Sequence, residues 1–158
     1  MCRRQRFSNI AYNASLKSDQ KFRHGAVITK NSKIICVGHN QGSRTKCLNN
    51  IRSCVHAEMY AANKLVKMLK KKHGAKFKQY TSKYTMWVVR IPTKTGNTFD
   101  FVDSKPCFYC VKDMIYLGFN KVGYSDSKGD IIIDTLTNIS EQPMHKSNIQ
   151  IRFENYFR

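Results

Sequence analysis

Residues 104–118 read Ser-Lys-Pro-Cys-Phe-Tyr-Cys-Val-Lys-Asp-Met-Ile-Tyr-Leu-Gly. Cys107 and Cys110 follow closely after Pro106, and apolar residues continue at helical spacing as far as Gly118. Proline is favoured where a helix begins, because its missing N–H would be unpaired there anyway, so we expect both sulfurs on the first turn of a helix. The positive end of the helix dipole favours thiolates, and two thiolates one turn apart can bind one metal ion.

A second stretch, Cys-Val-His-Ala-Glu at 54–58, opens another helical pattern, which we expect to run over 54–72 and to be closed by Gly74. If the two helix starts face each other, His56 adds an imidazole to the two thiolates. Zn²⁺ takes four ligands, so three protein ligands leave one position for water, as in catalytic zinc sites. Glu58 would then lie beside the metal without binding it, where a carboxylate can carry a proton from that water to a leaving amine.

These two motifs, His56-Ala57-Glu58 and Pro106-Cys107-Phe108-Tyr109-Cys110, resemble the signature of the zinc-dependent cytidine/deoxycytidylate deaminase superfamily. The resemblance covers about residues 5–135. It implies that Zn²⁺ is bound by His56, Cys107 and Cys110, and that Glu58 is the catalytic residue. It also implies a substrate-binding set made up of Asn40, Ala57, Ser104 and Lys105.

The fold that the resemblance implies is of the α/β class. It has three layers, α-β-α, around a central mixed five-stranded sheet, in one domain over 1–158. The hydrophobic pattern agrees with this architecture. Before the Pro-Cys helix we expect, besides the helix at 54–72, a helix at 6–17, a hairpin of strands at 24–30 and 34–40, a polar loop at 75–83 and a buried strand at 84–91.

The end of the chain indicates how the sheet is completed. Strands expected at 121–125 and 130–133 are joined by only four residues, which forces an antiparallel pair. Within the superfamily, free cytidine deaminases end in this way, whereas deoxycytidylate, tRNA-adenosine and polynucleotide deaminases insert a helix and run parallel. The free cytidine enzymes, however, usually carry cysteine where this chain has His56. The tail at 138–158 has mixed periodicity that is compatible with a helix or a strand.

An insertion at 92–103 departs from the superfamily pattern. It contains a turn at 95–97, and Lys94, Phe99 and Phe101 give it a composition compatible both with stacking on a base and with packing on the core.

Several polar side chains have two interpretations. Asn40 lies at a strand end, where its amide can bind a ribose hydroxyl of the substrate or stabilise a turn of the backbone. Lys105 can meet a substrate phosphate or point to water. Cys47 and Cys54 are candidates for a second, structural zinc, although no complete ligand set is visible. Neither His24 nor His39 is expected to be a ligand.

The charge of the chain is extreme. There are 28 Lys and Arg residues against 10 Asp and Glu residues, a formal net charge of +18. This excess favours a polyanionic partner or a phosphorylated substrate, such as single-stranded nucleic acid bound through a basic surface. It is equally compatible with a Lys-rich composition spread over a solvated surface.

Other compositional features concern location and assembly. No apolar run approaches 18 residues, so we expect no membrane span, and the basic residues 2–6 lack the apolar region of a secretory signal. Six cysteines without an export signal indicate free thiols in a reducing, cytoplasmic compartment. By analogy with the superfamily we expect a homo-oligomer.

The expected activity is hydrolytic deamination of cytosine in a nucleoside or nucleotide (cytidine, deoxycytidine or deoxycytidylate), giving uracil and ammonia. The resemblance implies that zinc lowers the pKa of a bound water and that Glu58 shuttles its proton. One alternative is a nucleic-acid deaminase acting on cytosine in single-stranded DNA or RNA, or on adenosine in tRNA. Another is a non-enzymatic zinc domain that binds nucleic acid and does not need Glu58.

Overall fold

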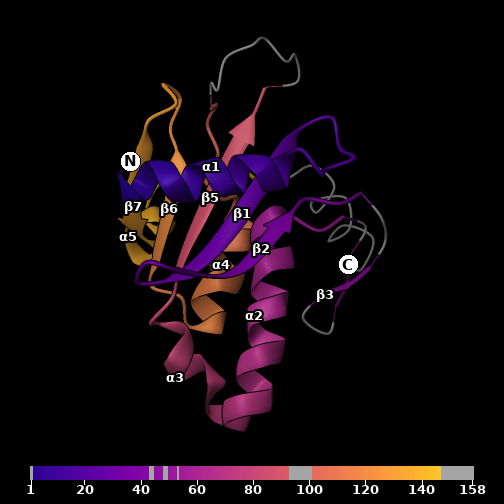
Figure 1. Ribbon diagram of the computed structural model, residues 1–158. Helices are drawn as coiled ribbons and strands as arrows, with labels where there is room; N and C mark the ends of the chain where they lie inside the picture. The colour runs from indigo at the N-terminus through magenta and orange to yellow at the C-terminus, as the bar shows by residue number, and fades with distance from the viewer. Residues whose placement is uncertain (1, 43–44, 48–49, 53, 93–100, 147–158) are drawn as a thin grey trace.

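The computed structural model describes residues 2–42, 45–47, 50–52, 54–92 and 101–146 (Figure 1). Its centre is a five-stranded sheet in the order β2-β1-β5-β6-β7. β5 and β6 run parallel, and the other neighbouring pairs of this sheet are antiparallel. The strands are β1 (Arg23–Lys30), β2 (Lys33–His39), β5 (Thr85–Ile91), β6 (Lys121–Ser125) and β7 (Ile131–Thr135).

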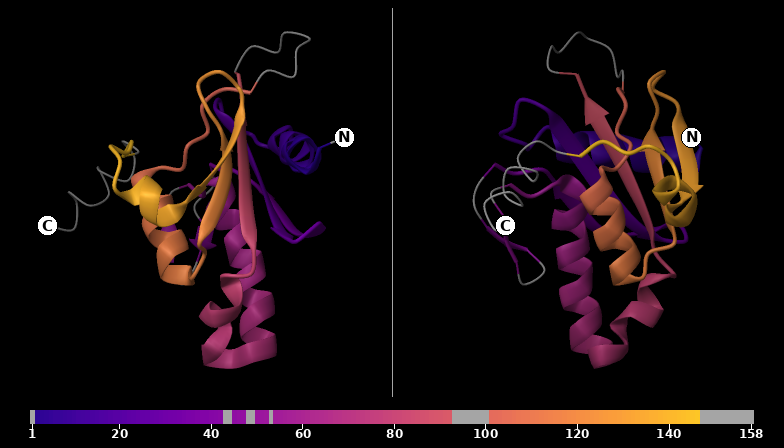
Figure 2. Two further views of the ribbon diagram at one scale, coloured as in Figure 1. Left: turned by 90° about the vertical axis from the view of Figure 1, so that its left-hand side faces the viewer. Right: turned by 180° about the vertical axis from the view of Figure 1, so that it is seen from behind.

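Helices cover both faces of this sheet, as the side view in Figure 2 shows. α1 (Arg3–Ser15) lies on one face, and α2 (Ala57–His73) and α4 (Phe108–Leu117) lie on the other. Alternation along the strands explains the division, because successive side chains point to opposite faces. In β5, Trp87 and Val89 pack with α1, whereas Met86 and Val88 pack in the core on the α2 side. The three-layer α/β fold with a mixed five-stranded sheet is therefore confirmed.

α1 lies very close to the sheet. A Cβ atom at Gly25 would overlap the backbone carbonyl oxygen of Ala11, so only glycine permits this approach. The ring centroids of Phe7 and Trp87 are 5.1 Å apart, and the Trp87 indole N–H donates to Thr29 Oγ1 at 2.9 Å. These contacts fix the layer opposite the metal-binding helices.

Helix ends follow the sequence signals closely. α2 ends at His73, with Gly74 at φ 57°, and α4 ends at Leu117, with Gly118 in the left-handed conformation at φ 92°. The helices predicted at 6–17 and 54–72 begin and end within three residues of the observed bounds.

The prediction of a polar loop at 75–83 was wrong. The structure has a short 3₁₀ helix, η1 (Gly74–Lys76), followed by α3 (Phe77–Thr81). Phe77 is buried in the core on the α2 side, and Tyr80 packs against the same core, so two aromatic side chains hold this Lys-rich segment on the protein. Between β2 and α2 the chain forms a second small sheet of β3 (Thr45–Cys47) and β4 (Asn50–Arg52), paired antiparallel.

The C-terminal half of the sheet agrees with the prediction. The β6–β7 turn is closed by the N–H of Asp126, which donates to the carbonyl of Asp130 at 2.9 Å, and the two strands are antiparallel. The start of the tail forms a short helix, α5 (Leu136–Ser140). The predicted turn at 95–97, Phe99 and the segment 147–158 lie outside the described residues. In the part of the chain that is described, no helix combines the length and apolarity needed to cross a membrane.

Candidate metal centre and active site

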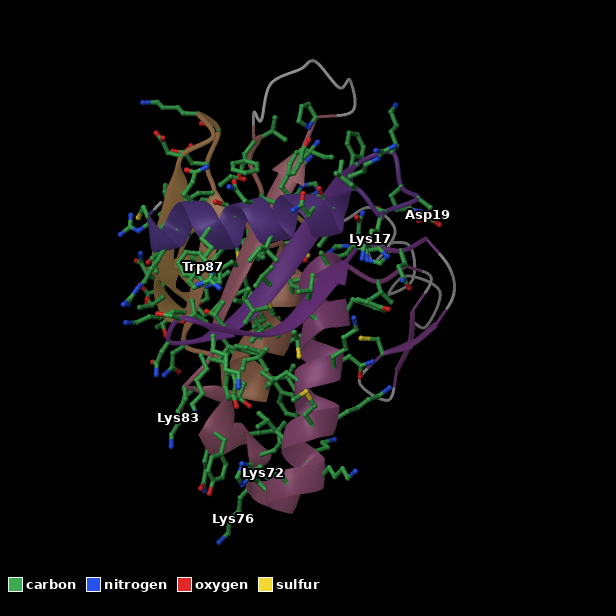
Figure 3. The ribbon with its side chains drawn as sticks, viewed as in Figure 1. Lys17, Asp19, Lys72, Lys76, Lys83 and Trp87 are labelled. Carbon is green, nitrogen blue, oxygen red and sulfur yellow. The ribbon has the colours of Figure 1, made fainter. Side chains whose placement is uncertain are left out.

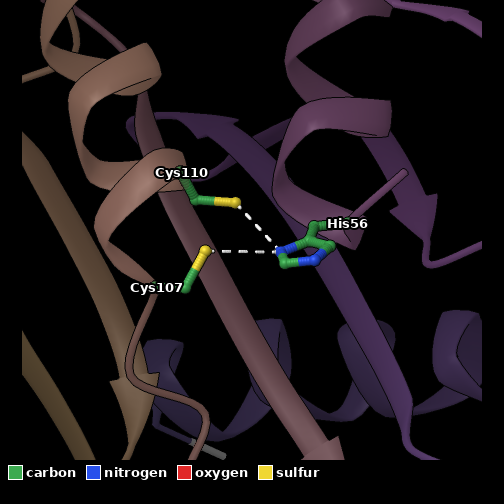
Figure 4. Close-up of side chains that lie close together, drawn as sticks. All are labelled: His56, Cys107 and Cys110. Atoms are coloured by element: carbon green, nitrogen blue, oxygen red, sulfur yellow. Dashed lines mark hydrogen bonds between the residues drawn. The ribbon is translucent and has the colours of Figure 1, made fainter. Parts of the chain in front are cut away.

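The metal motifs meet where two helices begin. His56 is the N-cap of α2 and Cys107 is the N-cap of α4, each with an extended backbone and a carbonyl that accepts the first helical hydrogen bond. Figure 4 shows the His56 ring facing both sulfurs. Pro106 lies one residue before the N-cap rather than inside the helix, so Cys107 stands at the helix boundary and Cys110 on the first turn.

The spacing of the three side chains suits one zinc ion. His56 Nδ1 lies 3.5 Å from Cys107 Sγ and 3.2 Å from Cys110 Sγ, and all three ligand atoms lie within 4.8 Å of one another. Tetrahedral zinc with Zn–S near 2.3 Å and Zn–N near 2.0 Å requires an N···S separation of about 3.5 Å. One imidazole and two buried sulfurs at this separation therefore fit Zn²⁺ and leave a fourth position for a non-protein ligand.

Proton sharing within the cluster is strong. The hydrogen bond with Cys110, helped by His56, lowers the pKa of Cys107 to about 4 despite burial. The same shared bond and burial raise the pKa of Cys110 well above its ordinary value. Burial alone would lower the pKa of His56, but hydrogen bonds with Cys107 and Cys54 and the charge of Glu58 raise it to about 11. A divalent cation would displace these protons, since metal ligands bind deprotonated.

Glu58 lies on the first turn of α2, two residues after His56. Its side chain is only 4% exposed, and burial, the largest influence, raises the pKa of its carboxyl group. A carboxyl group whose pKa is raised toward neutrality can both accept and donate a proton, which is the property required of a general acid–base.

A cavity of about 490 Å³ opens beside the cluster. Its volume is in the range of small-molecule sites. It brings together β1, β5, the start of α2, the segments that follow β2 and α5, and the segment that leads into α4. The residues that line it are Phe22, His24, Asn40, His56, Glu58, Arg90, Asp103, Ser104, Lys105, Cys107 and His145.

A family model described as the cytidine and deoxycytidylate deaminase zinc-binding region matches residues 1–126. The chain belongs to this deaminase family. The family implies a zinc-dependent hydrolase that acts on carbon–nitrogen bonds, in agreement with the geometry of the cluster.

Solved structures show a similar fold. A cytidine deaminase from Burkholderia pseudomallei is 20% identical, with a TM-score of 0.56 over 85% of this chain and 94% of that chain. A dCMP deaminase from the cyanophage S-TIM5, in apo form, is 25% identical, with a TM-score of 0.48 over 78% of this chain and 82% of that chain. No curated protein matches by sequence. The first similarity supports the deaminase fold.

The side chain of Asn40 lines the deaminase cavity, but both of its polar atoms already have partners. Its Oδ1 accepts a hydrogen bond from the N–H of His24 at 2.8 Å, and its Nδ2 donates to the carbonyl of Phe22 at 2.7 Å. Asn40 thus ties the end of β2 to the start of β1. This favours a structural role, and its predicted contact with a sugar stays a prediction.

Ser104 and Lys105 lie at the cavity, immediately before the Pro-Cys motif. Ser104 is 3% exposed, and its Oγ donates to the carbonyl of Val88 at 2.9 Å and accepts from the N–H of Ser125 at 2.8 Å. The Nζ atom of Lys105 donates to Oε1 of Gln142 at 2.6 Å. Ala57, the first residue of α2, is fully buried and does not line the cavity.

Among the described residues, His56, Cys107 and Cys110 form the one cluster able to hold a metal ion. Cys47 is buried, and its thiol lies 3.6 Å from the carbonyl of Met59. His24 and His39 are not part of the cluster, as the sequence predicted.

The sequence interpretation missed five residues that line the cavity: Phe22, His24, Arg90, Asp103 and His145. Arg90 had a visible signal, because it is the only charged residue in the apolar strand Thr-Met-Trp-Val-Val-Arg-Ile at 85–91. Burial, followed by the charges of His56 and Arg90, lowers the pKa of His24 to about 4. The imidazole of His24 is therefore neutral at pH 7.

Proposed function

We propose that this deaminase converts the cytosine of a free nucleoside or nucleotide to uracil and releases ammonia. The observation that carries the proposal is the position of Glu58 beside the His56, Cys107 and Cys110 cluster, in the lining of a cavity of about 490 Å³. In this proposal the three side chains of the cluster hold Zn²⁺, and Glu58 is the catalytic residue.

Bound zinc supplies a Lewis acid that makes water a nucleophile at neutral pH. Glu58 accepts a proton from the attacking water and delivers it to the ring nitrogen next to C4. The oxygen adds to C4 as a hydroxyl group. Glu58 then takes the remaining proton of this hydroxyl and gives it to the exocyclic amine, so that the C4–N bond breaks, ammonia leaves and the C4 carbonyl of uracil forms. The resemblance implies that the backbone carbonyl of Ser104 or Lys105, just before the Pro-Cys motif, accepts a hydrogen bond from that amine.

Two features support a small substrate. The antiparallel β6–β7 ending is the one that the sequence resemblance associates with enzymes acting on free cytidine. The cavity also draws its lining from strands β1 and β5, from the starts of α2 and α4, and from the segments after β2 and α5, which suits a molecule held on several sides.

The test is ammonia release by the zinc-loaded protein, with cytidine, deoxycytidine, deoxycytidylate and a single-stranded cytosine oligonucleotide assayed side by side. We expect turnover of at least one monomer. Glu58→Ala should lower kcat about 10²- to 10⁴-fold because the proton carrier is lost, while bound zinc and the fold are retained. The control is Glu141→Ala, which removes an exposed carboxylate after α5 and should leave turnover unchanged.

The other outcomes separate the rival functions. Turnover of the oligonucleotide alone would replace the proposal with nucleic-acid deamination. The charge of residues 20–99, with 17 Lys and Arg residues against one carboxylate, favours this alternative. Absence of turnover on every substrate, with oligonucleotide binding that Glu58→Ala does not weaken, would make the chain a zinc-containing binding domain.

A further inference from the structure

Arg90 interrupts an apolar row on the face of the sheet that carries the active site. Met86 and Val88 belong to the core on the α2 side, and Arg90 is the next residue of β5 on the same face. Its partner across the sheet is His24 of β1, which occupies the corresponding place beyond Ala26 and Ile28. Both side chains therefore line the cavity instead of packing in the core.

The guanidinium of Arg90 lacks a counter-charge in the described ranges of the chain. Its Nε atom is buried with no hydrogen-bond partner there, and its contact with an aromatic ring is to Phe22, 4.7 Å from the ring centroid. The nearby cavity carboxylate, Asp103, accepts instead from the backbone N–H of Lys105 at 2.9 Å. Arginine stays charged in proteins, and the side chain of Arg90 is half-buried, with its buried Nε atom left unpaired in the described part of the chain. An anion that enters the cavity would supply the missing partner.

A second cation lies at the same cavity. Lys105 is held by Gln142 from the segment after α5, whose His145 also lines the space. The carboxylates of this lining are Glu58 and Asp103. Glu58 follows the metal ligand His56 by two residues and repels an anion, so we expect the anion at Arg90, where the planar guanidinium can bind two oxygens at once.

We propose that Arg90, assisted by Lys105, binds the phosphate of a nucleoside monophosphate, and that the substrate of this deaminase is therefore a nucleotide and not a nucleoside. This inference rests on the proposed function, because it assumes that the cytosine base of the substrate lies at Glu58. Phosphate is the anion that such a substrate carries, and charge-assisted hydrogen bonds from arginine to phosphate are among the strongest in proteins.

The experiment compares CMP and dCMP with cytidine and deoxycytidine on wild type and Arg90→Met. We expect wild type to prefer the monophosphates at least about tenfold in kcat/KM, since one charge-assisted bond contributes about 1.5–3 kcal/mol. Arg90→Met should raise KM for the monophosphates about 10- to 100-fold and leave kcat/KM for the nucleosides within about threefold. The matched control is Arg23→Met. Arg23 precedes His24 on β1, so the side chain of Arg23 points to the opposite face of the sheet. This variant should change neither value.

Several results would overturn the inference: nucleosides used as well as monophosphates by wild type, equal losses for both in Arg90→Met, or a single-stranded oligonucleotide preferred over dCMP. If Arg90→Met does not fold, the test uses inorganic phosphate as an inhibitor of the wild-type protein. Phosphate should inhibit dCMP turnover competitively, and more strongly than chloride at the same ionic strength. If phosphate inhibits no more than chloride, the proposed phosphate site is wrong. If the wild-type protein deaminates none of these substrates, the proposed function is wrong, whether or not the phosphate site exists. Calorimetric titration with dUMP and with deoxyuridine then tests the phosphate site alone. Equal affinities for the two compounds would exclude that site.

Discussion

Glu58, which is buried, and His24, which is partly buried, line the same cavity, and desolvation shifts their pKa values in opposite directions. Burial disfavours the charged form of each group, so it raises the pKa of Glu58 and lowers that of His24. For Glu58 the shift brings the carboxyl group closer to the range in which it can exchange protons with a substrate. For His24 it keeps a neutral ring next to the charged Arg90.

The His24 shift predicts a pH dependence of stability. The unfolded chain binds a proton at histidine near pH 6.5, whereas folded His24 does so only near pH 4. Its contribution to the free energy of unfolding is complete above pH 6.5 and decreases by up to about 3 kcal/mol as the pH falls to 4. Urea unfolding of wild type and His24→Asn at pH 7.5 and pH 5 measures this difference. An identical loss of stability in both chains would contradict it.

At the scale of elements, the starts of α2 and α4 form the metal centre together. Each helix presents one N-cap residue, His56 and Cys107, and the sheet holds the two helix starts side by side. Neither helix alone supplies more than two of the three donors. Metal affinity therefore depends on the packing between helices as well as on the ligands themselves.

This arrangement predicts the metal stoichiometry. The wild-type chain should bind one zinc ion at the cluster. The variant Cys107→Ser should contain much less zinc per chain, because a hydroxyl is a far poorer zinc ligand than a thiolate. Zinc released by denaturation can be titrated with a chromogenic chelator. The matched control is Cys36→Ser, which alters a buried thiol of β2 that contacts Met68. Equal zinc content in both variants would refute the ligand assignment.

The elements also show where sequence patterns suffice and where they do not. The Pro-Cys and His-Ala-Glu motifs predicted the cluster. Periodicity predicted most of the strands and helices, and the resemblance implied how the strands form one mixed sheet. α3 was missed because a five-residue helix has almost no periodicity of its own, and the burial of Phe77 depends on the tertiary neighbour α2. Arg90 was missed for the same kind of reason: its register opposite His24 places it at the cavity, and register is not visible in one strand.

At the scale of the whole molecule, positive charge gathers far from the active site. Figure 3 shows Lys72, Lys76 and Lys83 at the end of the protein where α2 ends, whereas the metal centre lies where α2 begins. A helix of 17 residues is about 25 Å long. These lysines therefore cannot touch a mononucleotide bound at Glu58. They form a positively charged surface that is separate from the active site.

The separation predicts that two properties can be changed independently. Changing Lys71, Lys72 and Lys76 together to Gln should reduce the salt dependence of single-stranded oligonucleotide binding by about two units in the slope of log K against log salt, as expected when three phosphate contacts are lost. Turnover of the monomeric substrate should stay the same. Fluorescence anisotropy between 50 and 200 mM salt gives the slope, and an unchanged slope would assign the charge to composition alone.

Ser104 has a consequence for how this protein can change over evolutionary time. Its hydroxyl and backbone connect it to Val88 of β5 and Ser125 of β6, so the chain is anchored to two strands just before the metal-binding helix begins. We expect the chain before this anchor to tolerate changes in length without shifting Cys107, because the contacts of Ser104 hold the start of α4 against the sheet. New substrate contacts can therefore arise there by insertion, and a reporter peptide can be grafted there, without rebuilding the catalytic centre.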